Sequence, residues 1–212
     1  MRIAIIGAGN VGSAIARGLQ GKGHDLRLGV RDPAGSASLA KALGANVATP
    51  KDAAQWAEVV VLALPWAVAE AAVAALGDLT GKIVIDCMNP IGRTAAGMGL
   101  VLGHDTSGGE VVQHWLPGAR VVKTLNQVGA EVMADTSGFI HPPVMFMAAE
   151  DAAAKAQVAI LLADLGFDAL DAGGIAMARL LEPMAMVWIN QAIFRGKERN
   201  WAFAAIEKGG DA

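Results

Sequence analysis

The feature that most constrains this chain is a glycine-rich turn near its N-terminus, Gly7-Ala8-Gly9-Asn10-Val11-Gly12. An apolar run over residues 2–6 precedes it, a helical pattern over 11–19 follows, and a second apolar run covers 25–30. Glycines at this spacing are typical of a βαβ unit that binds a dinucleotide, although an ordinary strand–turn–helix is the alternative. They would provide a tight turn, backbone approach to the pyrophosphate and close helix–strand packing. The pyrophosphate would lie at the helix N-terminus, where free N–H groups attract an anion.

The end of the second apolar run indicates which dinucleotide is bound. NAD-binding proteins usually place Asp or Glu there to hydrogen-bond the ribose 2′-OH. This chain has Val30, which cannot accept that bond, and then Arg31, which can pair with a 2′-phosphate and stack on adenine. Asp32 leaves NAD open, but we interpret it as the N-cap of a helix beginning at Pro33. Ser36 adds a hydroxyl donor, and NADP is therefore favoured.

Apolar runs of strand length alternate with helical segments along the chain. Several are continuous Val, Ile and Leu runs, which are typical of parallel strands covered on both faces. The alternation predicts an α/β fold, a doubly wound Rossmann parallel sheet with helices on both faces. The expected strands cover residues 2–6, 25–30, 59–64, 83–87, 121–125 and 144–148.

Helix start signals and the C-terminal pattern complete this outline. Thr49-Pro50 and the capping box Ser107…Glu110 predict two helix N-termini. After Ala149 we expect a helix over 151–165, a short strand over 168–171 and a long helix over 175–194. The chain has no Pro/Ser-rich linker there. We therefore expect a dinucleotide-binding domain over 1–149 and, over 150–212, a small α/β extension packed on it for acceptor binding or dimerisation.

Composition excludes several classes of function. The chain has 212 residues, a net charge of −3 and scattered Lys and Arg, so it lacks a basic field for nucleic acid or membranes. The N-terminal apolar run is too short for a signal peptide, and no stretch is long enough for a membrane helix. We expect a cytoplasmic protein. One cysteine and four histidines without metal-ligand spacing predict no metal site, and the absence of Tyr excludes a tyrosine acid.

Two further strand ends are candidates for the nicotinamide end of the site. Leu64-Pro65-Trp66-Ala67 follows one expected strand, and Asp86-Cys87-Met88-Asn89-Pro90 follows the next. Ligands of open α/β sheets bind outside the carboxyl ends of the strands, so both segments should line the ribose and nicotinamide. Trp66 either walls the pocket or packs half-buried. Asn89 either binds the ribose or forms a turn with Pro90.

The remaining polar residues give little support for acid–base catalysis. Hydride transfer between stacked rings needs positioning more than proton transfer. His141, in a loop before an expected strand, is a weak catalytic candidate. Lys123 and Asn126 invite comparison with the Lys/Asn pairs of hydroxyacid dehydrogenases. Residues i and i+3 of a strand point to opposite faces, so we interpret Lys123 as a structural or surface residue.

Over almost its whole length the chain resembles the coenzyme F420-dependent NADP oxidoreductases, which exchange hydride between NADP and F420. The resemblance rests on Gly7–Gly12, Gly29-Val30-Arg31, Lys123-Thr124-Leu125-Asn126, and Arg179-x-x-Glu182-Pro183 with Trp188. The oxidoreductase domain of STEAP metalloreductases, which uses NADPH with a flavin, is similar. The resemblance implies that Gly9–Gly12 and Arg31 hold the pyrophosphate and 2′-phosphate. It also implies a set of residues around the ribose and ring: Leu64–Ala67, Asn89 and Asn126.

Three functions remain open at this point. The first is an NADP(H)-dependent oxidoreductase that passes hydride between NADPH and a flavin or F420. The second is an NADPH-dependent reductase of a small imine or keto acid, which generally needs a larger helical C-terminal domain than the stretch after Ala149. The third is a non-enzymatic NADP(H) sensor. A small-molecule hydride acceptor and a homodimer are the expected partners.

Overall fold

The sheet is built outward from β1 (Arg2–Ile6), which the computed structural model, describing residues 1–208, places between two parallel neighbours. β2 (Asp25–Gly29) pairs with one side of β1, and β4 (Val59–Leu62) pairs with the other. All of β4 and the last four residues of β1 are buried. This burial is expected for continuous apolar strands covered on both faces.

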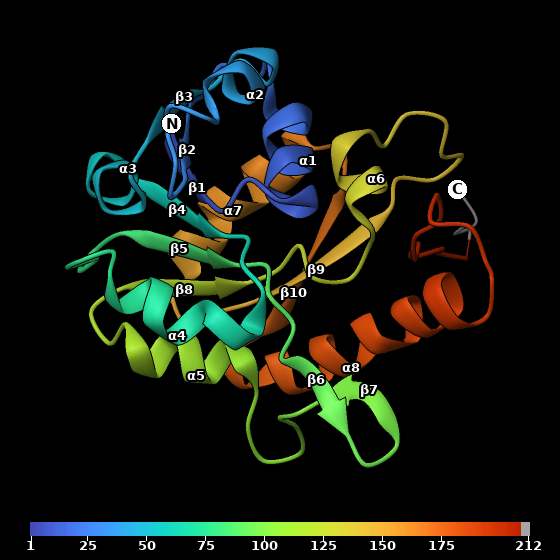
Figure 1. Ribbon diagram of the computed structural model, residues 1–212. Helices are drawn as coiled ribbons and strands as arrows, with labels where there is room; N and C mark the ends of the chain where they lie inside the picture. Colours follow the sequence, from blue (N-terminus) through green and yellow to red (C-terminus); the bar gives the residue numbers. More distant parts are fainter. Residues whose placement is uncertain (209–212) are drawn as a thin grey trace.

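The main sheet has eight strands, and six of them run parallel in the order β3-β2-β1-β4-β5-β8 (Figure 1). The strands not yet named are β3 (Asn46–Ala48), β5 (Ile83–Asp86) and β8 (Arg120–Lys123). This is the strand order of the doubly wound dinucleotide-binding fold, so the predicted Rossmann fold is confirmed. The order reverses between β1 and β4, where ligands of such folds bind at the carboxyl ends of the strands.

The sheet is not parallel throughout, because its last two strands run opposite to the other six. β9 (Val144–Ala148) joins β8 through an antiparallel bridge between Lys123 and Ala148, and β10 (Asp168–Gly173) lies parallel to β9. Only the short helix α6 (Ala130–Ala134) lies between β8 and β9. The chain therefore does not cross back over the sheet. β9 starts beyond the carboxyl end of β8 and runs back until its last residue, Ala148, lies opposite Lys123, the last residue of β8.

Helices cover both faces of the sheet (Figure 1). Besides α6 they are α1 (Asn10–Leu19), α2 (Ala37–Ala42), α3 (Pro50–Trp56), α4 (Trp66–Ala74), α5 (Gly108–Trp115), α7 (Ala152–Asp164) and α8 (Ala178–Ile189). Ile3 and Ile5 share a core with α1, α2, α6 and α7, whereas Ala4 and Ile6 share a second core with α3, α4 and α5. β1 contributes to both cores because alternate side chains of a strand point to opposite faces.

The structure contains three short strands that sequence patterns did not predict. β3 is a three-residue edge strand, and β6 (Ile91–Thr94) pairs antiparallel with β7 (Gly97–Leu100) as a separate hairpin. The hairpin follows β5 and packs against α8. Its strands contain Gly92, Gly97 and Gly99, which weaken the apolar alternation by which a strand is recognised.

Helix boundaries agree with the sequence at two positions and differ at two others. Thr49 caps α3 and Ser107 caps α5, as predicted. The helix expected from Pro33 begins only at Ala37, because the Asp32 carboxylate accepts a hydrogen bond from Gly35 N and closes a turn first. The helix expected over 175–194 consists of a 3₁₀ turn (Ile175–Met177), α8 and a π-helical turn (Asn190–Phe194). No helix in the described chain has the length and apolar character needed to cross a membrane.

Candidate cofactor site

The three glycines of the first loop are required for different reasons. Gly7 has a φ of +101°, and a Cβ atom there would lie 2.5 Å from the carbonyl oxygen of Ala63. A Cβ on Gly12 would overlap the carbonyl oxygen of Gly7, so this glycine permits helix–strand packing. Gly9 has an ordinary φ of −73°, and a Cβ there would meet no protein atom within 4 Å. Neither its backbone conformation nor its packing requires Gly9, so a bound ligand is the remaining physical reason for a glycine.

Gly9 borders a cavity of about 230 Å³ at the carboxyl ends of β1, β4 and β5. The lining residues are Gly9, Asn10, Val11, Ala63, Leu64, Pro65 and Cys87. The cavity therefore brings together five predicted site residues and lies where the strand order reverses. It also opens on the N-terminus of α1, whose first turn contains no acidic side chain. The free N–H groups of that turn fit a pyrophosphate.

Sequence reasoning missed one lining residue, Ala63, and expected Cys87 only as part of the segment Asp86–Pro90. Ala63 directly follows β4 and precedes the candidate Leu64, and this position is the signal that would have found it. Burial raises the pKa of the Cys87 thiol, and the neighbouring Asp86 charge raises it further. Cys87 therefore remains a neutral thiol and contributes apolar lining.

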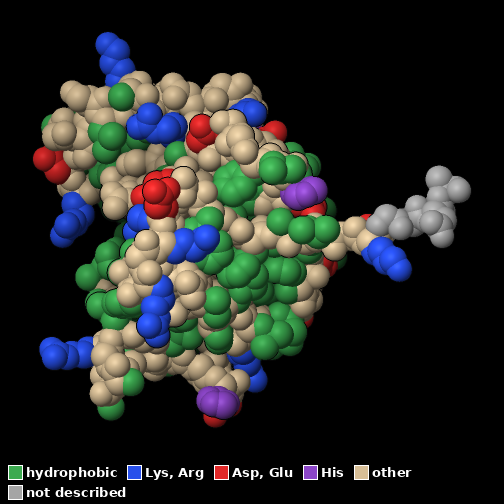
Figure 2. All heavy atoms as spheres, turned by 90° about the vertical axis from the view of Figure 1, so that its right-hand side faces the viewer, with side chains coloured by type: hydrophobic (Ala, Val, Ile, Leu, Met, Phe, Trp, Pro, Cys, Tyr) green, Lys and Arg blue, Asp and Glu red, His purple; other side chains and the backbone are tan. Residues whose placement is uncertain are grey.

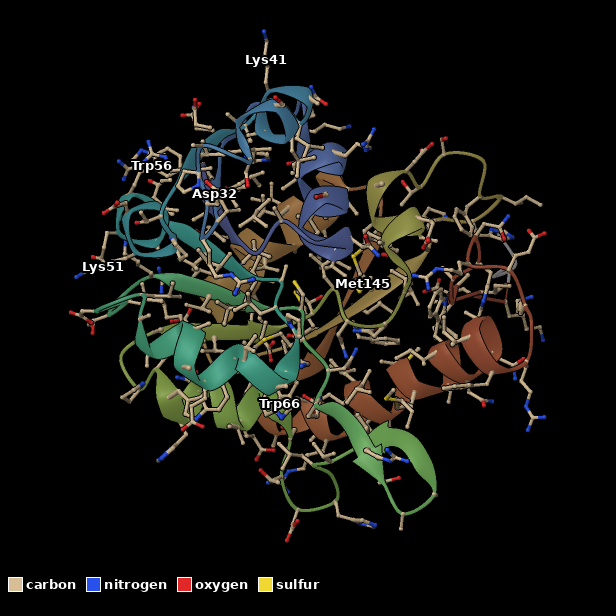
Figure 3. All side chains as sticks on the ribbon, viewed as in Figure 1. Asp32, Lys41, Lys51, Trp56, Trp66 and Met145 are labelled. Atoms are coloured by element: carbon tan, nitrogen blue, oxygen red, sulfur yellow. The ribbon has the colours of Figure 1, made fainter. Side chains whose placement is uncertain are left out.

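The side chains after β2 fit the adenine end of a dinucleotide. Val30 is buried and donates its N–H to Ala48, whereas Arg31 is exposed. The carboxylate of Asp32, in the loop between β2 and α2, is engaged by Gly35 N at 3.0 Å (Figure 3). Ser36 is half-buried and stands at the N-cap of α2. The loop thus exposes a guanidinium while its carboxylate is held by the backbone, an arrangement that suits a 2′-phosphate.

Trp66 packs between helices and is not a lining residue of the cavity. It begins α4 (Figure 3), and its ring stacks on Trp115 of α5, with ring centroids 5.4 Å apart. A Cβ on Gly108 would lie 3.3 Å from the Trp66 ring, so α5 approaches that ring closely. The half-buried packing role is the one that these contacts support.

Asn89 and Asn126 lie together at the ends of β5 and β8. The Asn126 side-chain amide donates to Asn89 Oδ1 at 3.0 Å and to the carbonyl of Leu181 at 3.2 Å. Its own oxygen accepts from Gln127, and its side chain is buried. Asn89 is half-buried and donates to the backbone carbonyl of Asn126. Asn126 is therefore committed to internal contacts that orient Asn89, the residue of this pair that can face a ligand.

Next to Asn89 lies a set of buried charged residues, Asp86, Lys123 and Glu182, which we call the buried ion cluster. Lys123 Nζ lies 2.9 Å from Asp86 Oδ2 and 2.9 Å from Glu182 Oε1, and all three side chains are at most 1% exposed. The same ammonium also donates to the Met88 carbonyl. Burial alone would lower the pKa of Lys123, but the two carboxylates outweigh burial and raise the pKa above its ordinary value. Lys123 is therefore a buried cation.

Of the two roles expected for Lys123, structural or surface residue, the surface role is thus wrong. The rule that residues i and i+3 of a strand point to opposite faces does not apply to Lys123 and Asn126, because β8 ends at Lys123 and Leu125 adopts a φ of +55°. Both side chains consequently reach the same two segments, residues 88–89 and 181–182. Sequence patterns also gave no pairing for Glu182, which accepts hydrogen bonds from the first N–H groups of α5 at 2.9 and 3.0 Å.

The carboxyl ends of the parallel strands lie on the right-hand side of Figure 1, and Figure 2 looks onto this edge. Hydrophobic side chains gather across its centre, with charged side chains mostly around them (Figure 2). The surface beside the cavity is therefore mainly apolar.

His141, the weak catalytic candidate, is exposed in the loop that leads to β9 and does not line the cavity.

Comparisons with known proteins agree with this geometry. The family described as NADP oxidoreductase, coenzyme F420-dependent, matches residues 2–90. A crystal structure from Arthrobacter sp. FB24, provisionally named as an F420-dependent NADP reductase, superposes with a TM-score of 0.88 at 36% identity, covering 98% of this chain and 100% of that one. The F420-dependent NADP reductase of Methanothermobacter marburgensis is 29% identical over 90% of this chain and 92% of its own length.

Two further proteins are longer than this chain, which matches only part of each. Rat metalloreductase STEAP3 is 27% identical over 87% of this chain, which spans only 36% of STEAP3. An imine reductase from Myxococcus stipitatus shares the fold alone, with a TM-score of 0.70 at 19% identity, covering 92% of this chain and 63% of that one. Taken with the glycine loop, Arg31 and the cavity, the full-length match to the Arthrobacter structure shows that this chain belongs to the coenzyme F420-dependent family of NADP oxidoreductases and is an NADP-dependent enzyme.

Proposed function

We propose that this protein transfers a hydride between NADPH and a flat ring acceptor of the flavin or deazaflavin class, with coenzyme F420 as the first candidate. The observation that carries the proposal is the open position beside Gly9, in a cavity whose other walls come from the start of α1 and from the segments that follow β4 and β5. The relatives from Arthrobacter and Methanothermobacter are named for F420-dependent NADP reduction, which supports this acceptor.

Each predicted contact has a physical role in this proposal. The first N–H groups of α1 bind the pyrophosphate, and Arg31 and Ser36 bind the 2′-phosphate. Leu64 and Pro65 form the wall beside the nicotinamide, and Asn89 hydrogen-bonds its ribose. When bound, NADPH supplies the hydride, and the protein contributes orientation and exclusion of water.

The character of the cavity lining favours a ring acceptor over an imine or keto acid. Reduction of a carbonyl or imine also requires a proton at its oxygen or nitrogen. Among the described residues that line the cavity, the only titratable side chain is Cys87, whose raised pKa makes it a poor proton donor. An apolar surface beside the cavity fits an aromatic ring and offers little recognition of a carboxylate.

The deciding experiment follows NADPH oxidation with F420, FMN, FAD and a panel of imines and keto acids. The proposal expects turnover with F420 or a flavin and little with the panel. Turnover with the imines or keto acids but not with F420 or a flavin would instead identify an imine or keto-acid reductase. Tight NADPH binding without any turnover would favour the non-enzymatic sensor. A Gly9→Val variant, which should fold but not bind NADPH, serves as the matched blank.

We also propose that the protein works as a homodimer and that the cytoplasm is its compartment. Apolar side chains exposed on α8, Leu180 at 64% and Val187 at 54%, support an interface there. Light scattering on purified protein measures the mass in solution, and a monomer at micromolar concentration would contradict the dimer.

A further inference from the structure

The buried ion cluster has no part in the proposed function so far, yet it is costly to bury. Asp86, Lys123 and Glu182 place three formal charges where at most 1% of each side chain is exposed. Buried ion pairs of this kind are often no more stabilising than well-packed apolar side chains of similar volume. Fold stability alone therefore does not explain the cluster.

The cluster holds a segment that runs along the cofactor cavity. Lys123 bonds the carboxylate of Asp86 and the carbonyl of Met88, the two residues that flank the cavity-lining Cys87. Asp86 Oδ1 in turn accepts from Met88 N at 2.9 Å. Both sides of Cys87 are thus fixed, and the direction in which the chain continues to Asn89 is fixed with them.

Lys123 and Asn126 act on this segment from one strained turn. Leu125, between them, is buried and adopts a left-handed φ of +55°, which is unfavourable for a bulky side chain. This turn lets Lys123 reach Met88 and Glu182 while Asn126 reaches Asn89 and the Leu181 carbonyl. Backbone strain retained beside a ligand site commonly has a functional reason.

We propose that Lys123 is a positioning residue for the nicotinamide half of the cofactor site, acting through Met88 and Asn89. The inference rests on the proposed function only in that NADP(H) is the ligand, with its nicotinamide half beside Asn89. Lys123 itself is fully buried and touches no ligand. Its three bonds set the height and direction of the turn from which the Asn89 side chain projects.

The test separates the two halves of the ligand. Adenosine 2′,5′-bisphosphate probes only the adenine half, whereas NADP⁺ probes both, and neither requires the acceptor. The triple variant Asp86→Asn, Lys123→Met, Glu182→Gln removes all three charges and leaves no buried charge unpaired. We expect its Kd for NADP⁺ to rise about tenfold, the equivalent of one lost hydrogen bond, while the Kd for the bisphosphate stays within about twofold.

Two further variants keep the inference falsifiable. Lys155→Met is the control, because it breaks another lysine–carboxylate contact, in which Lys155 of α7 lies 2.7 Å from Asp171 of the edge strand β10. It should change neither Kd. If the triple variant fails to fold, Glu182→Gln alone keeps an oxygen for the α5 N–H groups but removes one partner charge of Lys123. It should weaken NADP⁺ severalfold and leave the bisphosphate unchanged.

A double-mutant cycle tests the route through Asn89. In an Asn89→Ala background the triple substitution should add less than about twofold, because residues that act through one another are not additive. Full additivity would overturn this route, and equal weakening of both ligands would reduce the cluster to a structural role. If the unmodified protein bound neither ligand, the proposed function and this inference would fall together.

Discussion

Asn126 and Asn89 hold each other by two hydrogen bonds of opposite direction. The Asn126 amide donates to Asn89 Oδ1 at 3.0 Å, and the Asn89 amide donates to the Asn126 carbonyl at 2.9 Å. The pair joins the ends of β5 and β8, next to the buried ion cluster. Asn89, which we propose to face the ligand, is thereby oriented by Asn126, whose side chain is buried.

Asn126→Ala should therefore affect both stability and cofactor binding. It removes the side-chain donor to the Leu181 carbonyl and to Asn89 Oδ1, and one of the two acceptors of the Gln127 amide. We therefore expect a loss of about 1–3 kcal/mol in the free energy of unfolding and weaker NADPH binding. Urea unfolding and NADPH titration measure the two effects. Gln113→Ala is the control, since Gln113 also bonds two backbone carbonyls, at Leu116 and Ala119. An equal loss of NADPH affinity in that control would contradict the assignment.

Gly9→Val and Gly12→Val should fail in different ways. A Cβ on Gly9 meets no protein atom within 4 Å, so the free energy of unfolding of Gly9→Val should lie within about 0.5 kcal/mol of the native value. The variant should nevertheless bind neither NADPH nor NADH. A side chain on Gly12 overlaps the Gly7 carbonyl and should cost about 1–3 kcal/mol of stability or more. Thermal melts and cofactor titrations distinguish these outcomes. Intact NADPH binding by Gly9→Val would show that the cofactor does not bind beside Gly9.

Arg31→Ala should change cofactor choice more than cofactor affinity in general. Loss of a charge-assisted contact to the 2′-phosphate should weaken NADPH by about 1.5–3 kcal/mol and NADH far less. The ratio of the two Kd values is the measurement. Arg27→Ala is the matched control, because Arg27 lies over the Trp56 ring at 4.1 Å and should not alter the ratio. Equal losses for both cofactors in Arg31→Ala would show that Arg31 does not bind the phosphate.

The ion pair between Glu110 and Arg179 should make stability depend on pH. The hydrogen bond from Arg179 holds the pKa of Glu110 below its ordinary value of 4.5, against burial, with help from Ser107. A carboxyl group whose pKa is lower in the folded protein than in the unfolded one stabilises the fold at pH values above its unfolded pKa. This stabilisation is lost as the pH falls through the folded pKa. Arg179→Gln should lower the free energy of unfolding at pH 7, and this deficit should shrink below about pH 4.5. A deficit that persists unchanged at pH 3 in thermal melts would contradict the pairing.

The buried ion cluster should be more sensitive to partial than to complete removal. Lys123→Met alone leaves two buried carboxylates without their cation and should cost about 3–5 kcal/mol. The neutral triple variant described above leaves no buried charge and should recover most of that loss. Denaturant midpoints compare the two proteins. A triple variant less stable than the single one would mean that the charges themselves stabilise the fold.

Much of the framework was predictable because its signals are local. The Gly7–Gly12 spacing, the continuous apolar runs of β1 and β4, and the caps at Thr49 and Ser107 each depend on neighbouring residues. These patterns were sufficient to predict a doubly wound parallel sheet and a ligand site outside the carboxyl ends of its strands. The predicted β4 and β8 ran two residues too far, because mainly apolar sequence continues past the last paired residue of each strand into the loop that follows.

The sequence by itself therefore determined a dinucleotide-binding sheet and the expected place of its ligand. Only the tertiary structure decided how that place is held in position. Glu182 is far from Asp86 in sequence, and no spacing pattern predicts that Lys123 will lie between them. The left-handed turn at Leu125 likewise removed the strand geometry by which Asn126 would have pointed away. A glycine loop is specified by local backbone conformation, whereas a buried charge is specified by the partners that the whole fold brings to it.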